Sequence, residues 1–323
     1  MTVSRVINGK NNVAEETRQK VLRVIDELGY VPHLQAQGLA SGRTRTIVLH
    51  YPLSNPRLFS NLIEQNFITG IAQGAADEDY YFSLATGALT PAGLKKLCRG
   101  ARADGLVLMQ IALHDWRVEL LREQDYPFVM IGRAENNQGL AFVDFDIEKA
   151  IGEAYSYLVG LGHRHIGFVT FPEEWRLQEM GGAMRSLRGF KSAARRFKIT
   201  PLHRESDLNI KRGYWAAKSL LQEDARVTAI VTVHNTLTVG AITALQEAGR
   251  KVPDDCSIMD IAIGTESDLI IPPLTGIEWP SYDIGFQAAK MLIRNLQGKS
   301  AEPEHVLVPP KLRVRGSTAP PPG

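Results

Sequence analysis

The stretch Thr2-Val3-Ser4-Arg5-Val6-Ile7-Asn8-Gly9 opens the chain and predicts a short amphipathic helix. Val3, Val6 and Ile7 fall at i, i+3 and i+4, so they share one helix face, and Gly9 ends the helix. The polar residues of this stretch are suited to contacts with the base edges or phosphates of double-stranded DNA, and they are Thr2, Ser4, Arg5 and Asn8.

A second amphipathic helix is predicted downstream, ending at Gly29 before Pro32. Its apolar stripe consists of Ala14, Val21, Leu22, Ile25 and Leu28. Residues 1–30 therefore predict a partial helix-turn-helix DNA-binding domain, although two amphipathic helices alone are also typical of other small helical modules. Residues 1–45 hold seven Lys and Arg against four Asp and Glu, and this local excess of positive charge favours contact with a duplex.

Residues 31–45 predict a short hinge helix followed by a linker. Pro32 suits a first helical turn, and Ala36, Leu39 and Ala40 share one side of the next turns. Such a short helix is too weak to be stable alone. Arg43 stands where it could meet a phosphate; the alternative is a flexible linker with no DNA contact.

Residues 46–316 alternate between short apolar runs and amphipathic runs, which predicts an α/β domain of parallel sheets covered on both faces. The pattern divides into two lobes, with the crossing at residues 140–146 and with 142–146 as the first strand of the second lobe. The helix at 281–297 and the strands at 305–308 and 312–315 follow it. The Pro-rich residues 317–323 are expected to be a disordered tail.

Several phrases along the chain closely resemble the lactose-repressor (LacI/GalR) family of transcription regulators. They occur in the family's order, and they include Leu28-Gly29-Tyr30-Val31-Pro32, Pro127-Phe128-Val129-Met130-Ile131-Gly132, Leu161-Gly162-His163-Arg164-His165 and Val252-Pro253-Asp254-Asp255. The resemblance implies a two-lobed, periplasmic-binding-protein-like domain that binds a small molecule and controls DNA affinity. It also implies that the hinge helices pair in the minor groove, where Leu39 matches the leucine that wedges into a base step.

The same resemblance identifies candidate residues for an effector, expected to be a carbohydrate, in the cleft between the lobes. Asp146 matches the family's cleft aspartate, although it could equally cap the helix that follows. Arg185 lies one residue before the position of the family's sugar-binding arginine, where this chain has Ser186. His234-Asn235 replaces the usual Asn-Asp, and Asp260 lies two positions before Ala262, which takes the usual place of an aspartate. Aromatic residues that could stack on a sugar or pack in the core are Phe171, Trp175, Trp215 and Trp279.

The composition of the chain limits the classes of protein to which it can belong. The chain has 323 residues, 44% hydrophobic and 22% charged, with a net charge of +2, and it shows neither a signal-peptide core nor a membrane-spanning run. A cytoplasmic protein with reduced thiols at Cys98 and Cys256 is therefore expected. Because no catalytic, nucleotide-loop or metal-ligand spacing occurs, we expect no enzymatic activity, cofactor or metal. The rival classes are a transport receptor and a Rossmann-type enzyme.

The sequence also bears on the oligomeric state of the chain and on its affinity for DNA. The apolar residues of a predicted helix at 57–76 favour a homodimer or larger assembly on a palindromic operator. Met1 directly precedes the recognition helix, whereas the family carries a further helix upstream. We therefore expect the first helix to be missing, by truncation or by a misassigned start. Such a chain would bind its effector but would bind DNA weakly and with steep salt dependence, and it could function as a sugar-binding protein without effective DNA binding.

Overall fold

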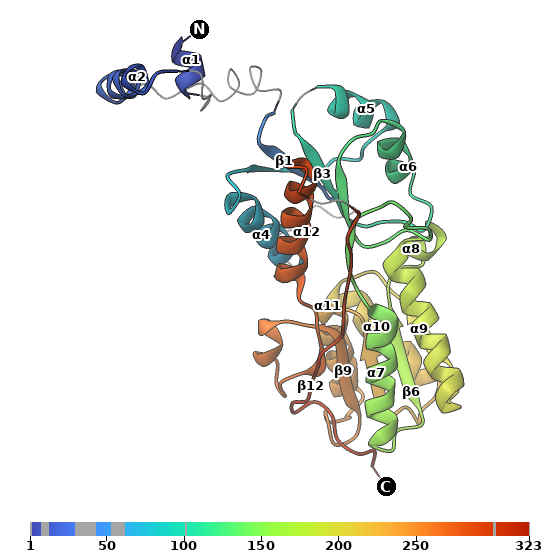
Figure 1. Ribbon diagram of the computed structural model, residues 1–323. Coiled ribbons are helices and arrows are strands. Elements are labelled where there is room, and N and C mark those ends of the chain that lie inside the picture. The colour runs from blue at the N-terminus through green and yellow to red at the C-terminus, as the bar shows by residue number, and fades with distance from the viewer. Residues whose placement is uncertain are drawn as a thin grey trace.

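The computed structural model describes residues 2–7, 13–29, 43–52, 62–100, 102–299 and 302–322. Two helices at the N-terminus, α1 (Thr2–Ile7) and α2 (Glu15–Glu27), confirm the two predicted there, and they lie outside the two lobes (Figure 1). Val6 is buried at 4% exposure, whereas Leu28 is 74% exposed and α2 has no fully buried residue. The predicted apolar stripe of α2 is thus largely uncovered by the described residues.

The first lobe is built on a parallel sheet in the order β11-β5-β4-β3-β1-β2. The four inner strands of this sheet are almost entirely buried and rich in apolar residues, as strands covered on both faces are, whereas the two edge strands keep exposed residues. The strands are β1 (Thr46–His50), β2 (Tyr81–Ala85), β3 (Gly105–Leu108), β4 (Phe128–Ile131), β5 (Phe142–Phe145) and β11 (His305–Val308). The helices of this lobe are α4 (Leu62–Ala76), α5 (Pro91–Arg99), α6 (Trp116–Glu123) and α12 (Ser281–Leu296).

The second lobe is built on a sheet in the order β12-β10-β9-β8-β6-β7, in which only β12 runs antiparallel to its neighbour. Its strands are β6 (Ile166–Thr170), β7 (Leu202–Glu205), β8 (Ala229–Thr232), β9 (Ser257–Ile263), β10 (Thr275–Glu278) and β12 (Leu312–Arg313). Its helices are α7 (Ile147–Gly160), α8 (Glu173–Leu177), α9 (Gly181–Phe197), α10 (Ile210–Glu223), α11 (Asn235–Glu247) and the 3₁₀ turn η2 (Thr265–Asp268).

The assignment of segments to lobes differs from the sequence prediction. Strand β5 was predicted to begin the second lobe, but it lies between β4 and β11 in the first sheet, so the chain crosses between β5 and α7. Helix α12 and β11 return to the first lobe, which leaves β12 alone to cross back (Figure 1). Apolar strands of this kind pair equally well in either sheet, so the local pattern could not decide between them.

Helices α4 and α12 of the first lobe pack unusually closely because glycines line their contact. A Cβ added at Gly70 would lie 2.1 Å from the carbonyl oxygen of Tyr282, and one at Gly285 would lie 2.4 Å from that of Phe67. Among the apolar residues of α4 that we expected to form a dimer interface, Ile71 and Ala75 are buried within the chain, Ile68 and Ala72 are half-buried, and Leu62 is exposed.

The C-terminal residues are ordered through 322, so the expectation of a disordered tail is wrong. Ser317 is fully buried; its hydroxyl donates to the carbonyl of Ile258 at 2.6 Å and accepts from the backbone N–H of Thr275 at 2.8 Å. The carbonyl of Ala319 accepts from the Ser257 hydroxyl at 3.0 Å and lies 2.9 Å from Nε2 of His163. These contacts attach the segment to β9 and β10 of the second lobe despite its proline content.

Two negative findings concern the described residues alone. None of the helices among them is long and apolar enough to cross a bilayer. Within the same ranges, no cluster of three or more His, Cys, Asp or Glu side chains is arranged to hold a metal ion.

Candidate ligand site between the two lobes

A cavity of about 170 Å³ lies between the two lobes, where strands of both sheets end. The carboxyl ends of parallel strands meet at one edge of a sheet, and the loops after them are the usual ligand site of such folds. Residues that follow β1, β3, β4, β6, β8 and β10 line the cavity, and they include Tyr51, Met109, Arg133, Phe171, Val233 and Trp279.

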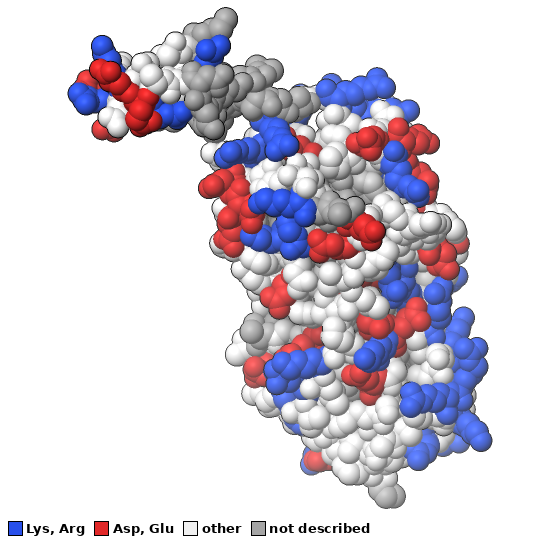
Figure 2. All heavy atoms as spheres, viewed as in Figure 1, with Lys and Arg blue, Asp and Glu red and all other residues white. Residues whose placement is uncertain are grey.

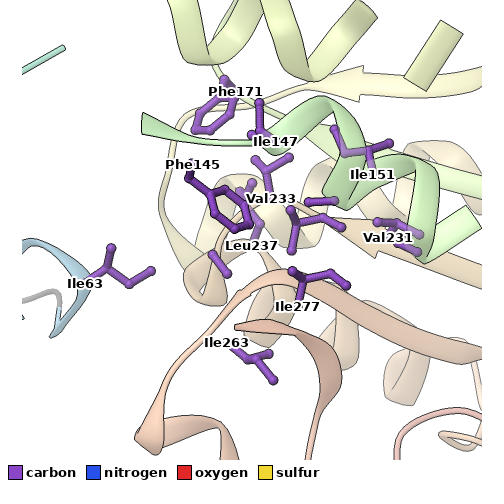
Figure 3. Close-up of a cluster of buried hydrophobic side chains, with 14 of the residues drawn as sticks. Ile63, Phe145, Ile147, Ile151, Phe171, Val231, Val233, Leu237, Ile263 and Ile277 are labelled. Atoms are coloured by element: carbon purple, nitrogen blue, oxygen red, sulfur yellow. The ribbon is translucent and has the colours of Figure 1, made fainter. Parts of the chain in front are cut away.

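Much of the cavity wall is apolar and aromatic. Phe145 lies against Trp279 with ring centroids 4.6 Å apart, and Phe171 stacks on Trp175 at 5.4 Å with an interplanar angle of 15°. In Figure 3, Ile63 extends from α4 on one side, and Phe145 and Phe171 lie on the other, with the second-lobe core behind them. Flat aromatic faces of this kind suit the apolar face of a sugar ring.

The carboxylate of Asp144 and the guanidinium groups of Arg133 and Arg185 contribute charge to the wall. Asp144, near the end of β5, accepts from Nε of Arg133 at 3.0 Å and from the backbone N–H of Phe145 at 2.9 Å. Burial raises the pKa of Asp144 more than the nearby charges of Arg185 and Arg133 lower it. The site is therefore dry enough that charge-assisted hydrogen bonds to a ligand would be strong.

A second carboxylate enters the cavity from the first turn of α4. The Tyr51 hydroxyl donates to Oε1 of Glu64 at 2.8 Å. Burial raises the pKa of Glu64, and this hydrogen bond only partly offsets it. Glu64 and Asp144 thus offer carboxylate oxygens to the same cavity from different elements of the first lobe.

His234 and Trp279 contribute further polar groups to the lining. Nδ1 of His234 accepts from the backbone N–H of Thr236 at 3.2 Å, which caps the N-terminus of α11. Burial lowers the pKa of His234 to about 4, so the imidazole is neutral at pH 7. The indole N–H of Trp279 is buried and has no hydrogen-bond partner among the described residues, and it is therefore a donor that a ligand could satisfy.

Of the five effector-site residues predicted from the sequence, Arg185 and His234 line the cavity. Asp146 is the N-cap of α7, its carboxylate accepting from the backbone N–H of Lys149 at 3.1 Å, which is the alternative role noted above. Asp260 is fully buried in β9, where it accepts from the Thr238 hydroxyl at 2.7 Å and from the backbone N–H of Ala262 at 2.8 Å. Neither aspartate is part of the described lining, and nor is Asn235.

Sequence reasoning did not select the carboxylates that the structure places in the cavity, Asp144 and Glu64. Asp144 is two residues from Asp146, and only the packing of β5 and the cap of α7 separate their roles. Phe171, Trp175 and Trp279 line the cavity, where stacking on a sugar stays a prediction, whereas Trp215 lies on α10 and is half exposed to solvent away from the cavity.

Direct hydrogen bonds join the lobes beside the cavity. The backbone N–H of Gly181 donates to the carbonyl of Ile111 at 2.8 Å, and that of Leu113 donates to the carbonyl of Glu179 at 2.8 Å. Arg185, on α9 of the second lobe, donates from Nη2 to the carbonyl of Ala134 in the first lobe at 3.0 Å. A cavity-lining side chain therefore also holds one lobe against the other.

The candidate DNA contacts are only partly described. Thr2 and Arg5 are exposed on α1, and Arg43 is exposed where the chain enters the first lobe. Asn8 and Leu39 lie outside the described residues, as does the side chain of Ser4. Asp104 fixes this entry point, since its carboxylate accepts from the backbone N–H groups of Thr44 at 2.7 Å and Arg45 at 2.9 Å.

Surface charge is not concentrated at the N-terminus alone. Lys and Arg side chains also gather along the flank of the second lobe over α9, and acidic and basic groups alternate on the N-terminal helices (Figure 2). Helix α9 contains no acidic residue. Positive charge by itself therefore does not locate the DNA-binding surface.

Two family models match the chain. The model for bacterial regulatory proteins of the lacI family matches residues 1–33, and the model for a periplasmic binding protein-like domain matches residues 155–318. Among curated proteins, the HTH-type transcriptional regulator CelR of Thermobifida fusca is 29% identical, covering 98% of this chain and 94% of the relative. Catabolite control protein A of Priestia megaterium is 30% identical, covering 98% of this chain and 95% of the relative.

Solved structures agree with this similarity. A complex of the transcriptional regulator CelR with cellobiose matches with a TM-score of 0.76 and 27% identity, covering 97% of this chain and 94% of that one. A lac repressor dimer bound to operator and the anti-inducer ONPF matches with a TM-score of 0.84 and 24% identity, covering 98% and 94%, and at that identity the match bears on the fold alone.

Proposed function

The chain belongs to the lacI family of bacterial regulatory proteins and is a ligand-responsive DNA-binding transcription regulator; we propose that its effector is a carbohydrate bound in the cavity between the lobes. The observation that carries the proposal is that Asp144, Arg133 and Arg185 line the same inter-lobe cavity as aromatic side chains. A similar regulator, CelR, has been solved with cellobiose, which supports a sugar as the class of ligand.

The chemistry of the cavity suits a neutral polyol. Carboxylate oxygens of Asp144 and Glu64 accept from sugar hydroxyls, while Arg185 and the indole N–H of Trp279 donate to hydroxyl or ring oxygens. The aromatic rings cover the C–H faces of the sugar. The charges of Asp144 and Glu64 balance those of Arg133 and Arg185, so the lining has no excess charge that would favour an anionic ligand.

The effector acts on DNA affinity by changing how the lobes sit together. Arg185 touches both the cavity and the opposite lobe, so a ligand that engages it stabilises one relative arrangement of the lobes. The first lobe carries the linker, held by Asp104, that leads to the DNA-binding helices. Because effector and operator then share one equilibrium, each changes the affinity for the other by the same factor.

We infer a homodimer acting in the cytoplasm on a palindromic operator. The support is the need to place two hinge segments side by side on a two-fold site. Ile71 and Ala75 of α4 are buried within the chain, so an interface on this helix would use the residues that stay exposed or half-exposed, Leu62, Ile68 and Ala72.

A thermal-shift screen tests the proposed effector class. The purified protein is heated with sugars, sugar phosphates and nucleosides, and a neutral sugar is expected to raise the melting temperature most, since any ligand selective for the folded state stabilises it. Hits are then titrated by calorimetry. The proposal fails if only charged ligands, or none of the sugars, stabilise a protein whose unfolding is cooperative.

A further inference from the structure

A second, outer cavity of about 550 Å³ adjoins the one described above. Gln110, Trp175 and Met180 line both, so the two spaces meet at these residues. The outer cavity also lies between the lobes, with α6 and the loop before it on one side and α8 on the other. It is therefore a continuation of the inter-lobe cleft toward solvent.

The floor of the outer cavity is a buried, fully engaged polar network. Arg117, 5% exposed, donates from Nε to Asp115 at 2.9 Å and from Nη2 to the carbonyls of Met109 at 3.1 Å and Gln110 at 2.7 Å. Its Nη1 lies 3.1 Å from Nδ1 of buried His50. The network ties the backbone of the loop after β3 to the start of α6, the segment that carries Gln110 and Trp116.

Aromatic and polar groups face the outer cavity from both lobes. Trp116, at the start of α6, is 42% exposed although it is among the largest apolar side chains, and Trp175 contributes from α8. Glu174 and Gln178, on and just after α8, supply an exposed carboxylate and amide, 3.0 Å apart, at the rim. Aromatic rings with a polar rim repeat the combination found in the inner cavity.

We propose that the outer cavity is a second sugar subsite, so that the effector is a disaccharide or a longer oligosaccharide with one ring in each cavity. This inference rests on the proposed function and deepens it. The inner cavity is smaller than the roughly 300–1,000 Å³ typical of small-molecule sites, whereas the outer cavity of about 550 Å³ lies within that range, so the two connected cavities have room for more than one sugar ring. A ligand that fills both cavities joins the lobes at two places, through Arg185 inside and through Trp116 and Trp175 outside.

Calorimetry of the full chain tests the subsite with matched monosaccharides and disaccharides. The probes are glucose, galactose and xylose, and the disaccharides maltose, cellobiose, lactose and xylobiose. We expect at least one disaccharide to bind more tightly than its component monosaccharides. Trp116→Ala should weaken that disaccharide by about 3- to 10-fold, the loss expected for one aromatic contact, and should leave the binding of any monosaccharide unchanged.

Trp215→Ala is the matched control, because it removes a half-exposed tryptophan of the second lobe that lines neither cavity. It should leave every affinity unchanged. The subsite is refuted if a monosaccharide binds as tightly as every disaccharide, or if Trp116→Ala binds the best disaccharide as the parent does. Absence of binding by all seven sugars would instead overturn the proposed sugar effector itself, so the two failures are distinguishable.

Discussion

Asp144→Asn separates ligand binding from folding more sharply than any other single substitution in the cavity. Asparagine keeps the shape of the side chain but removes the charge that faces Arg133 and Arg185. Burial outweighs these partners in setting the pKa of Asp144, so losing the charge removes an unfavourable desolvation together with an ion pair. We therefore expect a smaller loss of stability than the roughly 3–5 kcal/mol of breaking a fully buried pair, because Arg133 is partly exposed and Arg185 keeps its hydrogen bond to the carbonyl of Ala134.

Effector affinity should respond much more strongly. A hydrogen bond to a charged group contributes about 1.5–3 kcal/mol. Removing the charge should therefore raise the dissociation constant of the effector by roughly 10- to 150-fold. The assay is calorimetric titration of the sugar found in the thermal-shift screen, with urea unfolding measured on the same samples.

Asp146 provides the matched control two residues away. Asp146→Ala removes the cap of α7, so it should cost about 1 kcal/mol of stability and leave effector affinity unchanged, whereas Asp146→Asn should preserve both, since asparagine caps well. Asp144 is not the carboxylate that binds the effector if folded Asp146→Ala has a lower affinity for it while Asp144→Asn binds it like the parent.

Three further substitutions test the lobes and the core. In Gly181→Ala the added Cβ would lie 3.0 Å from the carbonyl of Ile111 and 2.4 Å from Nη1 of Arg185, so calorimetry should show weaker effector binding. Gly160→Ala, which has open space around it at the end of α7 and lines neither cavity, should bind normally, and equal affinities of the two variants would refute the inter-lobe contact. Gly70→Ala should destabilise the first lobe by about 1–3 kcal/mol in urea because its Cβ would overlap the carbonyl oxygen of Tyr282. Its control, Gly152→Ala in an open part of α7, should be neutral or stabilising by about 0.5–1 kcal/mol, and a neutral Gly70→Ala would show that α4 and α12 are not so close. Because the folded pKa of His234 lies below its unfolded value of 6.5, its contribution to stability is complete above pH 6.5 and is lost as the pH falls toward 4, by about 2 kcal/mol at pH 5. His234→Asn, which retains a capping side chain, should flatten the acid side of the stability profile, and identical profiles for parent and His234→Asn would contradict the burial of that imidazole.

The sequence predicted the helices and strands more accurately than it predicted the lobe to which each of them belongs. The alternation of apolar strands and amphipathic helices located most of both sheets because strands buried on both faces carry a continuous apolar signal. It did not reveal that β5, α12 and β11 belong to the first lobe, since strand pairing between distant segments leaves no local pattern. Strand β7 was missed because Leu202-His203-Arg204-Glu205 lies at a sheet edge and is mostly polar.

The ligand site was predictable in position and only partly in composition. The carboxyl ends of the strands indicate the cleft from topology alone. Choosing between Asp144 and Asp146, or recognising that Thr238 and the backbone of Ala262 already engage Asp260, requires knowing which way each side chain points after folding. That direction depends on capping and tertiary hydrogen bonds, which spacing in the sequence does not encode.

Fluorescence anisotropy of a labelled duplex shows whether a ligand in the inter-lobe cavity controls DNA affinity. The duplex is one selected by the full chain from random sequences, and its affinity is measured with and without saturating effector at fixed salt. We predict a change of about 5- to 150-fold, the range of a 1–3 kcal/mol coupling. Without effector, Asp144→Asn should bind the duplex with the affinity of the parent. It should need an effector concentration at least about 10-fold higher to change the duplex affinity as much as in the parent. An affinity for the duplex that is identical with and without a bound effector would show that the cavity does not control DNA binding.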